Sequence, residues 1–446
     1  MDDLSIDKNC EIVLFNSPIY RYHRDDGETY LPPLGQGYII TNLKRHGISA
    51  ALIDCAYNRL SISQIIDIIN CGDFPNIGFN IFSINMLLVK EILLGITRNV
   101  KIYIGGKAIE HLWKEVLTWN LKYPITFIIG EAECIFPALI LQNCKDIPFF
   151  DNGVHKAYLV DKNSCYYPFN LDCIDIDRAL FKDRNILNHY GRYEACIVAS
   201  RGCIYNCAFC GGATSVNPGI TARVRGNDSL VREIKSILDF SPEVSSIRFL
   251  DDLFLRDRKS VVDACRLFFS FPQIHWRCMA HVNTFVHNLD LIAEMKSSRC
   301  DEVFIGIESG SPDVRLRIHK NGTPKNIIRV IQKLLTEGID VKGYFMCGFP
   351  GETEDQLQET LDFATKLSKI AMVTESHFRP VVFQFRPYHG TELFNQLVQS
   401  GVNINYIRQE NFENSKQQYN FSAGNFSKVS DEVLKNYIDQ ISRLNG

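Results

Sequence analysis

Three cysteines stand close together near the middle of the chain. Cys203, Cys207 and Cys210 follow a C-x3-C-x2-C spacing inside the glycine-flanked stretch ASRGCIYNCAFCGG. Short spacings in such a loop let each sulfur turn inward, so three thiolates can converge on one metal centre. A zinc site would normally recruit a fourth Cys or His nearby, and the closest histidine, His189, lies 14 residues upstream of Cys203. Three ligands on a four-iron cluster leave one iron open, as a catalytic site requires.

The bulk composition is that of a folded protein with no strong electrostatic preference. The chain has 446 residues, 46% hydrophobic and 22% charged, with a formal net charge of −3. This balance argues against bulk nucleic acid or an anionic membrane as partners. The start, MDDLSIDKNC, is acidic, no apolar run is long enough to span a membrane, and fifteen cysteines without a secretion signal suit a reducing compartment. We therefore expect a cytoplasmic protein.

The first 145 residues alternate buried strands with helical patterns. Five strand-like runs, EIVLF, SAALIDC, NIGFNIFS, KIYIGG and TFIIGE, are each followed by a helix-like stretch. Five such units predict a doubly wound, Rossmann-like (flavodoxin-like) parallel sheet, whose ligand crevice lies beyond the carboxyl ends of the strands. Gly105, Gly106, Gly130 and Glu131 are expected at that crevice.

The rest of the chain divides into three parts. Residues 146–190 lose the alternation and are expected to connect the domains. Six further strand–helix units over 191–400 predict a partial (β/α)6 TIM-like barrel, with its chemistry on the loops at the carboxyl ends of the strands. Residues 401–446 are expected to form a polar tail with a short final helix. The predicted fold class is therefore α/β throughout, with two domains and a helical tail.

The cysteine loop resembles the signature of the radical S-adenosylmethionine (SAM) enzymes, in which three cysteines hold a [4Fe-4S] cluster that binds SAM. Four later stretches follow in the order of the subfamily with an N-terminal cobalamin-binding domain: FLDDLF, GIESGSPDVRLRIHKNGT, GYFMCGFPGETEDQL and RPYHGTEL. The stretches LPPLGQG, KIYIGGKAIEHL and IIGEAECIFPAL are similar to glycine loops of the same subfamily's first domain.

The resemblance implies roles for residues of the second domain. Cys203, Cys207 and Cys210 are the metal ligands, and Phe209 between them contacts the adenine. Five more are assigned to cofactor and substrate: Asp251, Asp252, Glu308, Ser309 and Gly348. Asp251 is assigned to SAM and Asp252 to substrate, although paired aspartates at a strand end can also mark a turn or a helix cap. Glu308 and Ser309 suit ribose hydroxyls or the ammonium of SAM, with helix capping as the alternative.

Two positions depart from the subfamily pattern. His281 stands near a position where Arg-x-Asp is often found, and it could handle protons near the reaction or be an ordinary hydrogen-bonding residue. Cys347 precedes the glycine turn and could donate a hydrogen atom or pack as a buried hydrophobe. We include Asp252, His281 and Cys347 as catalytic candidates.

The first domain is expected to bind cobalamin through its glycine loops at Gly35, Gly105, Gly106, Gly130 and Glu131. No D-x-H-x-x-G string that would supply a histidine to cobalt occurs. The resemblance implies reductive cleavage of SAM to a 5′-deoxyadenosyl radical and cobalamin-dependent methylation of an unactivated carbon in a natural product, peptide or lipid.

Two alternatives remain at this point. One is a radical SAM dehydratase, epimerase or cyclase with an unused cobalamin-type domain, and the other is a non-catalytic iron-sulfur or zinc protein. The expected partners are a small-molecule or peptide substrate and a reductase, flavodoxin or ferredoxin as electron donor.

Overall fold

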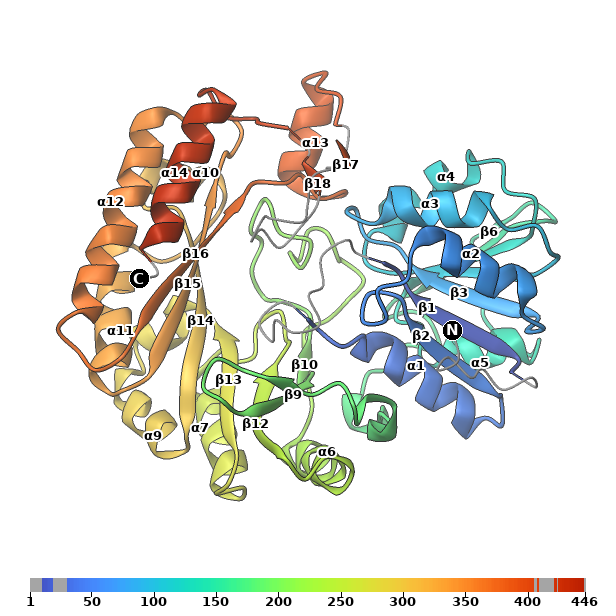
Figure 1. Cartoon of the computed structure of the whole chain (residues 1–446), viewed down its shortest axis with the longest axis horizontal. Helices are drawn as coiled ribbons and strands as arrows, with labels where there is room; N and C mark the ends of the chain where they lie inside the picture. The colour runs from blue at the N-terminus through green and yellow to red at the C-terminus, as the bar shows by residue number, and fades with distance from the viewer. Residues whose placement is uncertain (1–9, 19–29, 405–406, 409–420, 423, 445–446) are drawn as a thin grey trace.

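The structure is a computed structural model that describes residues 10–18, 30–404, 407–408, 421–422 and 424–444. Two α/β units lie side by side, the first drawn blue to cyan and the second green to red in Figure 1. Each is built on a seven-stranded sheet. None of the described helices is both long and apolar enough to cross a membrane.

The first sheet confirms the flavodoxin-like prediction. Its five leading strands run parallel in the order β2-β1-β3-β4-β5, the doubly wound order with the first strand inside. Separate apolar clusters cover its two faces, one built with helices α2, α3 and α4 and the other with α1 and α5. The strands are β1 (Ile12–Asn16), β2 (Ala50–Asp54), β3 (Asn76–Asn80), β4 (Lys101–Gly105) and β5 (Ile125–Gly130). The helices are α1 (Leu34–Arg45), α2 (Ile62–Cys71), α3 (Met86–Leu94), α4 (Ile109–Leu117) and α5 (Ile135–Ile140).

The predicted domain boundary at residue 145 is too early. Strand β7 (Lys156–Val160) pairs in parallel with β5, and β6 (Phe150–Asp151) closes the edge antiparallel to β7. No helix follows β7, so the strand–helix alternation stops while the sheet continues. The segment beyond it packs between the domains, because Ile176 and Phe181 share an apolar cluster with Tyr38 of α1 and Cys196 of the barrel.

The second sheet is the predicted six-stranded parallel half barrel. Its order is β16-β15-β14-β13-β12-β9, with the short antiparallel strand β8 (Ile186–Leu187) at the edge. Its strands are β9 (Tyr193–Ile197), β12 (Val244–Phe249), β13 (His275–Ala280), β14 (Cys300–Glu308), β15 (Asp340–Cys347) and β16 (Phe378–Gln384). Its helices are α6 (Asn227–Phe240), α7 (Arg258–Phe269), α8 (Val282–Val286), α9 (Ile292–Ser297), α10 (Pro312–Arg317), α11 (Pro324–Thr336), α12 (Glu354–Ala371) and α13 (Glu392–Gln399).

The last helix belongs to the barrel rather than to a separate tail. Helix α14 (Asp431–Arg443) buries Leu434, Tyr437, Ile438 and Ile441 in the main core, next to β16 and α12 (Figure 1). Much of the polar stretch before it lies outside the described residues. The prediction of a final helix is confirmed, but its apolar face completes the barrel wall.

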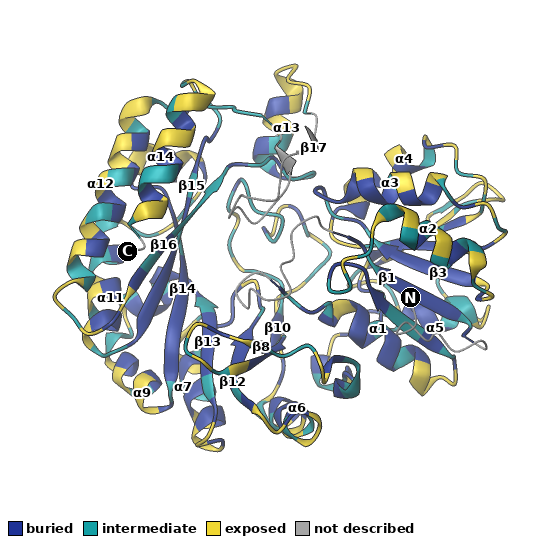
Figure 2. Cartoon of the chain, in the orientation of Figure 1, coloured by how far each residue is buried: buried dark blue, intermediate teal, exposed yellow. Residues whose placement is uncertain are grey.

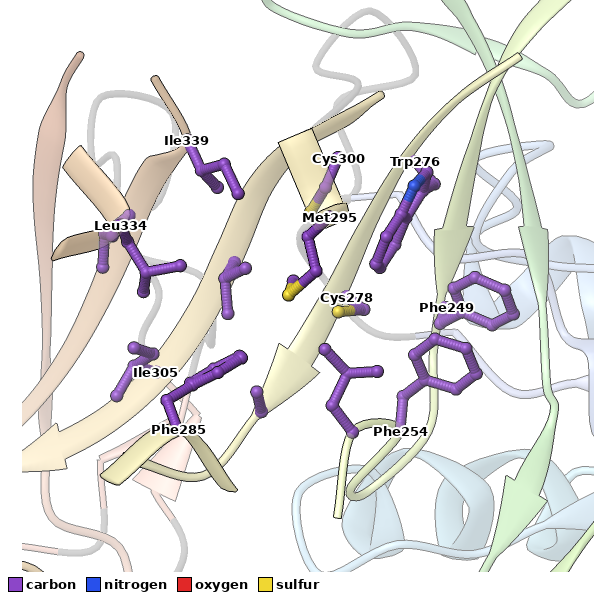
Figure 3. Packing of buried hydrophobic residues seen from close by; sticks show 14 of the residues in the cluster. Phe249, Phe254, Trp276, Cys278, Phe285, Met295, Cys300, Ile305, Leu334 and Ile339 are labelled. Atoms are coloured by element: carbon purple, nitrogen blue, oxygen red, sulfur yellow. The ribbon is translucent and has the colours of Figure 1, made fainter. Parts of the chain in front are cut away.

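The main core lies between the curled sheet and its outer helices. Most strands of the sheet are buried, β16 is mostly intermediate, and exposed residues gather on the outward faces of the helices (Figure 2). Figure 3 shows the aromatic part of this core, where the rings of Phe249 and Phe254 stack with centroids 3.8 Å apart. Trp276 stacks on Phe268 at 5.1 Å and is fully buried. This packing holds the strands that carry the functional loops.

Candidate functional site

The three cysteines lie on one loop with a narrow base. Strands β10 (Ser200–Arg201) and β11 (Arg223–Val224) pair antiparallel, with Arg201 opposite Arg223. The loop between them follows strand β9, as predicted, and carries Cys203, Cys207 and Cys210. Gly202, at its start, has φ +81°, a conformation that favours glycine.

The three thiols are suited to bind iron. All three are partly exposed, and backbone N–H groups donate to two of them, Tyr205 to Cys203 Sγ at 3.4 Å and Gly212 to Cys210 Sγ at 3.3 Å. Burial raises the pKa of Cys210 to about 12, so this thiol is protonated at neutral pH until a metal displaces the proton. As placed, no three His, Cys, Asp or Glu side chains of the described residues are gathered closely enough for a single metal ion. A four-iron cluster distributes its cysteines over separate irons.

The aromatic residue between the last two cysteines contacts the glycine turn after β15. The ring of Phe209 meets that of Phe349 at 5.7 Å in an edge-to-face arrangement. Gly348 beside it has φ +90°, and the buried Glu352 accepts from the N–H groups of Gly348 (2.6 Å) and Phe349 (3.0 Å). Burial raises the pKa of Glu352 to about 7, against these hydrogen bonds, which lower it. The structure therefore brings together two motifs that lie far apart in the sequence.

At the end of β14, Glu308 pairs with a buried lysine. Lys320 Nζ lies 2.9 Å from Glu308 Oε1, and both side chains are nearly fully buried. Glu308 has φ +66°. A Cβ on Gly306 would come within 2.7 Å of both charged groups, so a larger residue there would displace the ends of these two side chains. Burial raises the pKa of the Cys207 thiol, whereas the charge of Lys320 lowers it, so this cation acts directly on the cysteine loop.

Ser309 points elsewhere. Its hydroxyl lies 2.9 Å from that of Thr360 on α12, and it is fully buried. These contacts join β14 to the outer helices. Cofactor binding by Ser309 stays a prediction that its contacts do not favour.

The two aspartates after β12 have different environments. Asp251 is buried and accepts from the N–H of Ala199 at 3.0 Å and from the Ser200 hydroxyl, so it braces the strand that leads into the cysteine loop. Burial raises the pKa of Asp251 to about 6, although these hydrogen bonds oppose the rise. Asp252 is exposed and lies against Gly212, where an added Cβ would approach its carboxylate at 3.3 Å. Asp252 is therefore the aspartate available to a ligand.

Proton handling by His281 stays a prediction that its contacts do not favour. Its Nδ1 accepts from the N–H of Asn283 at 3.1 Å as the N-cap of α8, and its ring stacks on Tyr205 at 4.1 Å. Burial, with the positive charges of Lys320 and Arg315, lowers the pKa of His281 to about 3. With Nδ1 accepting, the ring carries its proton on Nε2, a buried atom without a hydrogen-bond partner in the structure. His281 offers a donor beside the cysteine loop, not a base.

Cys347 lies in the hydrophobic core with no exposed surface. Burial raises the pKa of its thiol well above the ordinary range. These surroundings are those of a residue that packs as a buried hydrophobe, and a catalytic role for Cys347 stays a prediction.

A cavity of about 300 Å³ lies between the two domains. The first domain contributes the loops after β4 and β5, and the barrel contributes the ends of β9 and β12 and the start of the cysteine loop. Its lining includes the predicted site residues Gly106, Gly130, Glu131, Asp251 and Asp252, together with Lys107, Glu110, Ile129, Val198, Ser200, Arg201, Gly202, Asn217, Ile220 and Leu250. The crevice at the carboxyl ends of the first sheet therefore opens onto the cysteine loop.

The glycines assigned to cobalamin differ in whether the backbone around them leaves room for a side chain. Gly106 and Gly130 have φ +103° and +95°, and an added Cβ would come within 2.6 Å of Ile81 backbone and 2.2 Å of Val160 O. Gly105 has one neighbour, Ile128 O at 3.4 Å, and Gly35 has none within 4 Å. Neither Gly35 nor Gly105 lines the cavity, so two of the four glycines assigned to cobalamin, Gly106 and Gly130, line it.

Comparison with known proteins identifies the second domain. Residues 197–364 match the radical SAM superfamily. The chain therefore contains a radical SAM domain. It is 27% identical over 409 residues to an uncharacterized methyltransferase of Pyrococcus horikoshii, covering 89% of this chain and 86% of that protein. It is 25% identical over 253 residues to the bacteriochlorophyllide d C-12(1)-methyltransferase of Chlorobaculum tepidum, covering 54% of this chain and 51% of that one.

Solved structures share the fold of both domains. The radical SAM methyltransferase TsrM from Kitasatospora setae, solved with cobalamin and a [4Fe-4S] cluster, superposes with a TM-score of 0.67 and 13% identity, covering 98% of this chain and 89% of TsrM. The cobalamin-dependent radical enzyme OxsB, solved with aqua-cobalamin and SAM, superposes with a TM-score of 0.68 and 16% identity, covering 96% of this chain and 65% of OxsB. These likenesses confirm the predicted two-domain α/β fold.

Several residues of this site were not predicted. Lys320, Glu352, Arg201 and Arg223 are largely buried charged residues beside the predicted motifs. Lys320 and Glu352 stand inside the quoted stretches, and for Glu352 the charge within the glycine-rich GFPGE was the available signal. The pairing of Arg201 and Arg223 could not be read from sequence, because their partner lies in the other domain.

Proposed function

We propose that this radical SAM enzyme is a cobalamin-dependent C-methyltransferase that acts on an unactivated carbon of a natural product, peptide or lipid. The observation that carries the proposal is the cavity that joins the carboxyl ends of the first sheet to the start of the cysteine loop. A methyl carrier in the first domain and a radical source in the barrel need such a shared space to act on one substrate. The solved methyltransferase TsrM, which binds cobalamin, supports this because its two-domain fold matches 98% of this chain.

The donor set fits the expected groups. Three partly exposed thiols, two of them with backbone N–H donors, would hold the cluster, and Gly348 and Phe209 would face the adenine of SAM. Gly106, Gly130 and Gly202 line the cavity without side chains and would let a flat corrinoid approach the backbone. No histidine is among the described residues that line this cavity. When bound, the cluster and SAM supply a 5′-deoxyadenosyl radical, and the corrinoid supplies the methyl group.

The chain's own residues bind, orient and exclude water. Lys320 holds the Glu308 carboxylate in place, so this carboxylate can receive hydroxyl or ammonium donors without changing its position. Asp252 presents an exposed carboxylate at the cavity, where a substrate can bind. The edge-to-face pair of Phe209 and Phe349 closes the side of the site toward α10 and α13 with apolar surface. The electron needed for SAM cleavage would come from a reductase, flavodoxin or ferredoxin.

The test uses protein purified anaerobically from cobalamin-fed cells. We expect iron, sulfide and cobalt in the protein, 5′-deoxyadenosine on reduction with SAM, and transfer of a deuterated methyl group from labelled SAM into a component of candidate extracts. The Cys210→Ala variant should lose iron and 5′-deoxyadenosine together, while Cys265→Ala, a buried thiol of the core, should keep both. A folded, iron-loaded protein without cobalt would overturn the methyltransferase proposal.

A second function rests on one observation. Glu131, expected at the corrinoid, is engaged by arginines of the barrel, so this glycine loop also serves domain contact. A radical SAM dehydratase, epimerase or cyclase with an unused first domain would form 5′-deoxyadenosine, contain no cobalt and transfer no labelled methyl.

A further inference from the structure

The base of the cysteine loop is held by a ladder of only four residues. Ser200 pairs with Val224 and Arg201 with Arg223, and all three cysteines lie in the loop that this ladder closes. Directly opposed arginines place two positive charges next to each other, which destabilises a strand pair unless an anion lies between them. Beyond these two residue pairs, the N–H of Arg225 donates to Ala199 O at 2.8 Å and continues the ladder. This bond does not offset the opposed charges, so the two arginines need an anionic partner.

That partner is Glu131 of the first domain. Its Oε2 accepts from Arg201 Nη1 at 2.7 Å, and its Oε1 accepts from Arg223 Nη2. Glu131 and Arg223 are buried, with 8% and 9% of their surface exposed. One carboxylate thus bridges the two arginines at the neck of the loop, with one oxygen for each.

Glu133 provides an internal comparison. It is also buried and accepts from Arg201 Nη2 at 2.7 Å, but the structure gives it no contact with Arg223. Burial alone would lower the pKa of Arg201, yet Glu133 and Glu131 raise it above its ordinary value. Both carboxylates therefore stabilise the guanidinium of Arg201, and only Glu131 links the two strands.

We infer that Glu131 is a positioning residue that clasps the neck of the cysteine loop, and not a corrinoid ligand. The inference rests on the proposed function only in assigning the loop to a cluster. Through this carboxylate the first domain fixes the geometry of the cysteine loop. Glu131 also lines the interdomain cavity. A buried carboxylate with both oxygens engaged by guanidinium groups is already satisfied and has little to offer a further ligand.

Limited proteolysis of the full-length, metal-free chain tests the clasp directly. No Lys or Arg occurs between Arg201 and Arg223, so trypsin releases the whole cysteine loop as the peptide 202–223 only when both arginines become accessible. In the Glu131→Gln variant we expect release of this peptide to accelerate about tenfold. The cysteine loop can then open locally without the free-energy cost of breaking the charged bridge to the two arginines. In the matched Glu133→Gln variant we expect release within about twofold of the wild type, because the bridge remains.

Equal rates for Glu131→Gln and Glu133→Gln, or a wild-type rate for Glu131→Gln, would overturn the inference. Circular dichroism establishes that each variant is folded. Should Glu131→Gln unfold, Arg223→Gln removes the same bridge from the barrel side; because it also removes the tryptic site at 223, its readout is the rate of cleavage after Arg201, which is expected to rise likewise.

Iron binding gives a second measurement. After anaerobic reconstitution, Glu131→Gln should hold less iron and sulfide than Glu133→Gln, and its reduced cluster should show an altered electron paramagnetic resonance signal with SAM. A wild-type electron paramagnetic resonance signal in Glu131→Gln would contradict the inference that Glu131 positions the cysteine loop. If the wild type itself binds no iron, the proposed function fails, while the proteolysis result still decides the clasp.

Discussion

Lys320 Nζ lies 2.9 Å from Glu308 Oε1, and both groups are withdrawn from water beside the cysteine loop. Removing one partner of a buried pair leaves the other charge uncompensated. We expect Lys320→Met to lower the free energy of unfolding by about 3–5 kcal/mol. The double variant Lys320→Met/Glu308→Gln should recover part of that loss, because no charge remains buried alone. Urea denaturation of the single and double variants measures this coupling.

The exposed pair of Arg258 and Asp290, with Nη2 and Oδ2 2.7 Å apart, is the control for this experiment. Arg258→Met should change the free energy of unfolding far less than Lys320→Met does, because water screens the exposed pair. An equal loss from Lys320→Met and Arg258→Met would show that burial does not govern the pair.

Asp251 predicts a specific pH dependence of stability. Burial raises its pKa from 3.8 to about 6, so between these values the folded state holds a proton that the unfolded state has lost. The stability contributed by this group therefore falls as pH rises through that window, by about 3 kcal/mol at most, and stays low above it. Asp251→Asn cannot ionise. The unfolding free energy of Asp251→Asn relative to wild type should rise from pH 4 to pH 6 and then level off. A difference that is constant over this range would contradict the predicted shift.

His281 predicts a difference between two substitutions. His281→Ala removes the acceptor for the Asn283 N–H and the stack on Tyr205, and should cost about 1 kcal/mol of stability. His281→Asn keeps a side-chain acceptor at the N-cap and should cost less. Because its lowered pKa of about 3 keeps the ring neutral, the pH profile of 5′-deoxyadenosine formation in His281→Asn should retain the inflections of the wild type. Loss of an inflection between pH 6 and 8 would show that His281 titrates in the working enzyme.

Two glycines of the first domain predict opposite effects of alanine. Gly130→Ala places a Cβ 2.2 Å from Val160 O at a positive φ, so it should destabilise the protein strongly. Gly35→Ala lies in helix α1 with open space around it, and should leave the metal-free protein unchanged or more stable by up to about 1 kcal/mol. If Gly35 contacts the corrinoid, as its motif predicts, Gly35→Ala should nevertheless lower the cobalt content. Thermal unfolding and cobalt analysis separate these effects, and full cobalt retention would remove Gly35 from the corrinoid site.

The sequence by itself determined the two α/β units and the grouping of the cysteines. Hydrophobic alternation located the strands of both sheets, because a strand buried on both faces leaves a local apolar run. Alternation failed at β7, which has no helix after it, and at α14, where it did not show that the apolar face covers the barrel. Local patterns report which residues are buried, and not what covers them.

Only the tertiary structure decided which charged residues act together. Glu131 reaches Arg201 and Arg223 across the domain boundary, and Lys320 reaches Glu308 by folding back over Gly306. It also separated Asp252, which is open to the cavity, from its neighbour Asp251, which is buried in hydrogen bonds, and it lowered the pKa of His281 by burial beside two cations. These differences depend on distance, charge and the exclusion of water, which the order of residues along the chain does not specify.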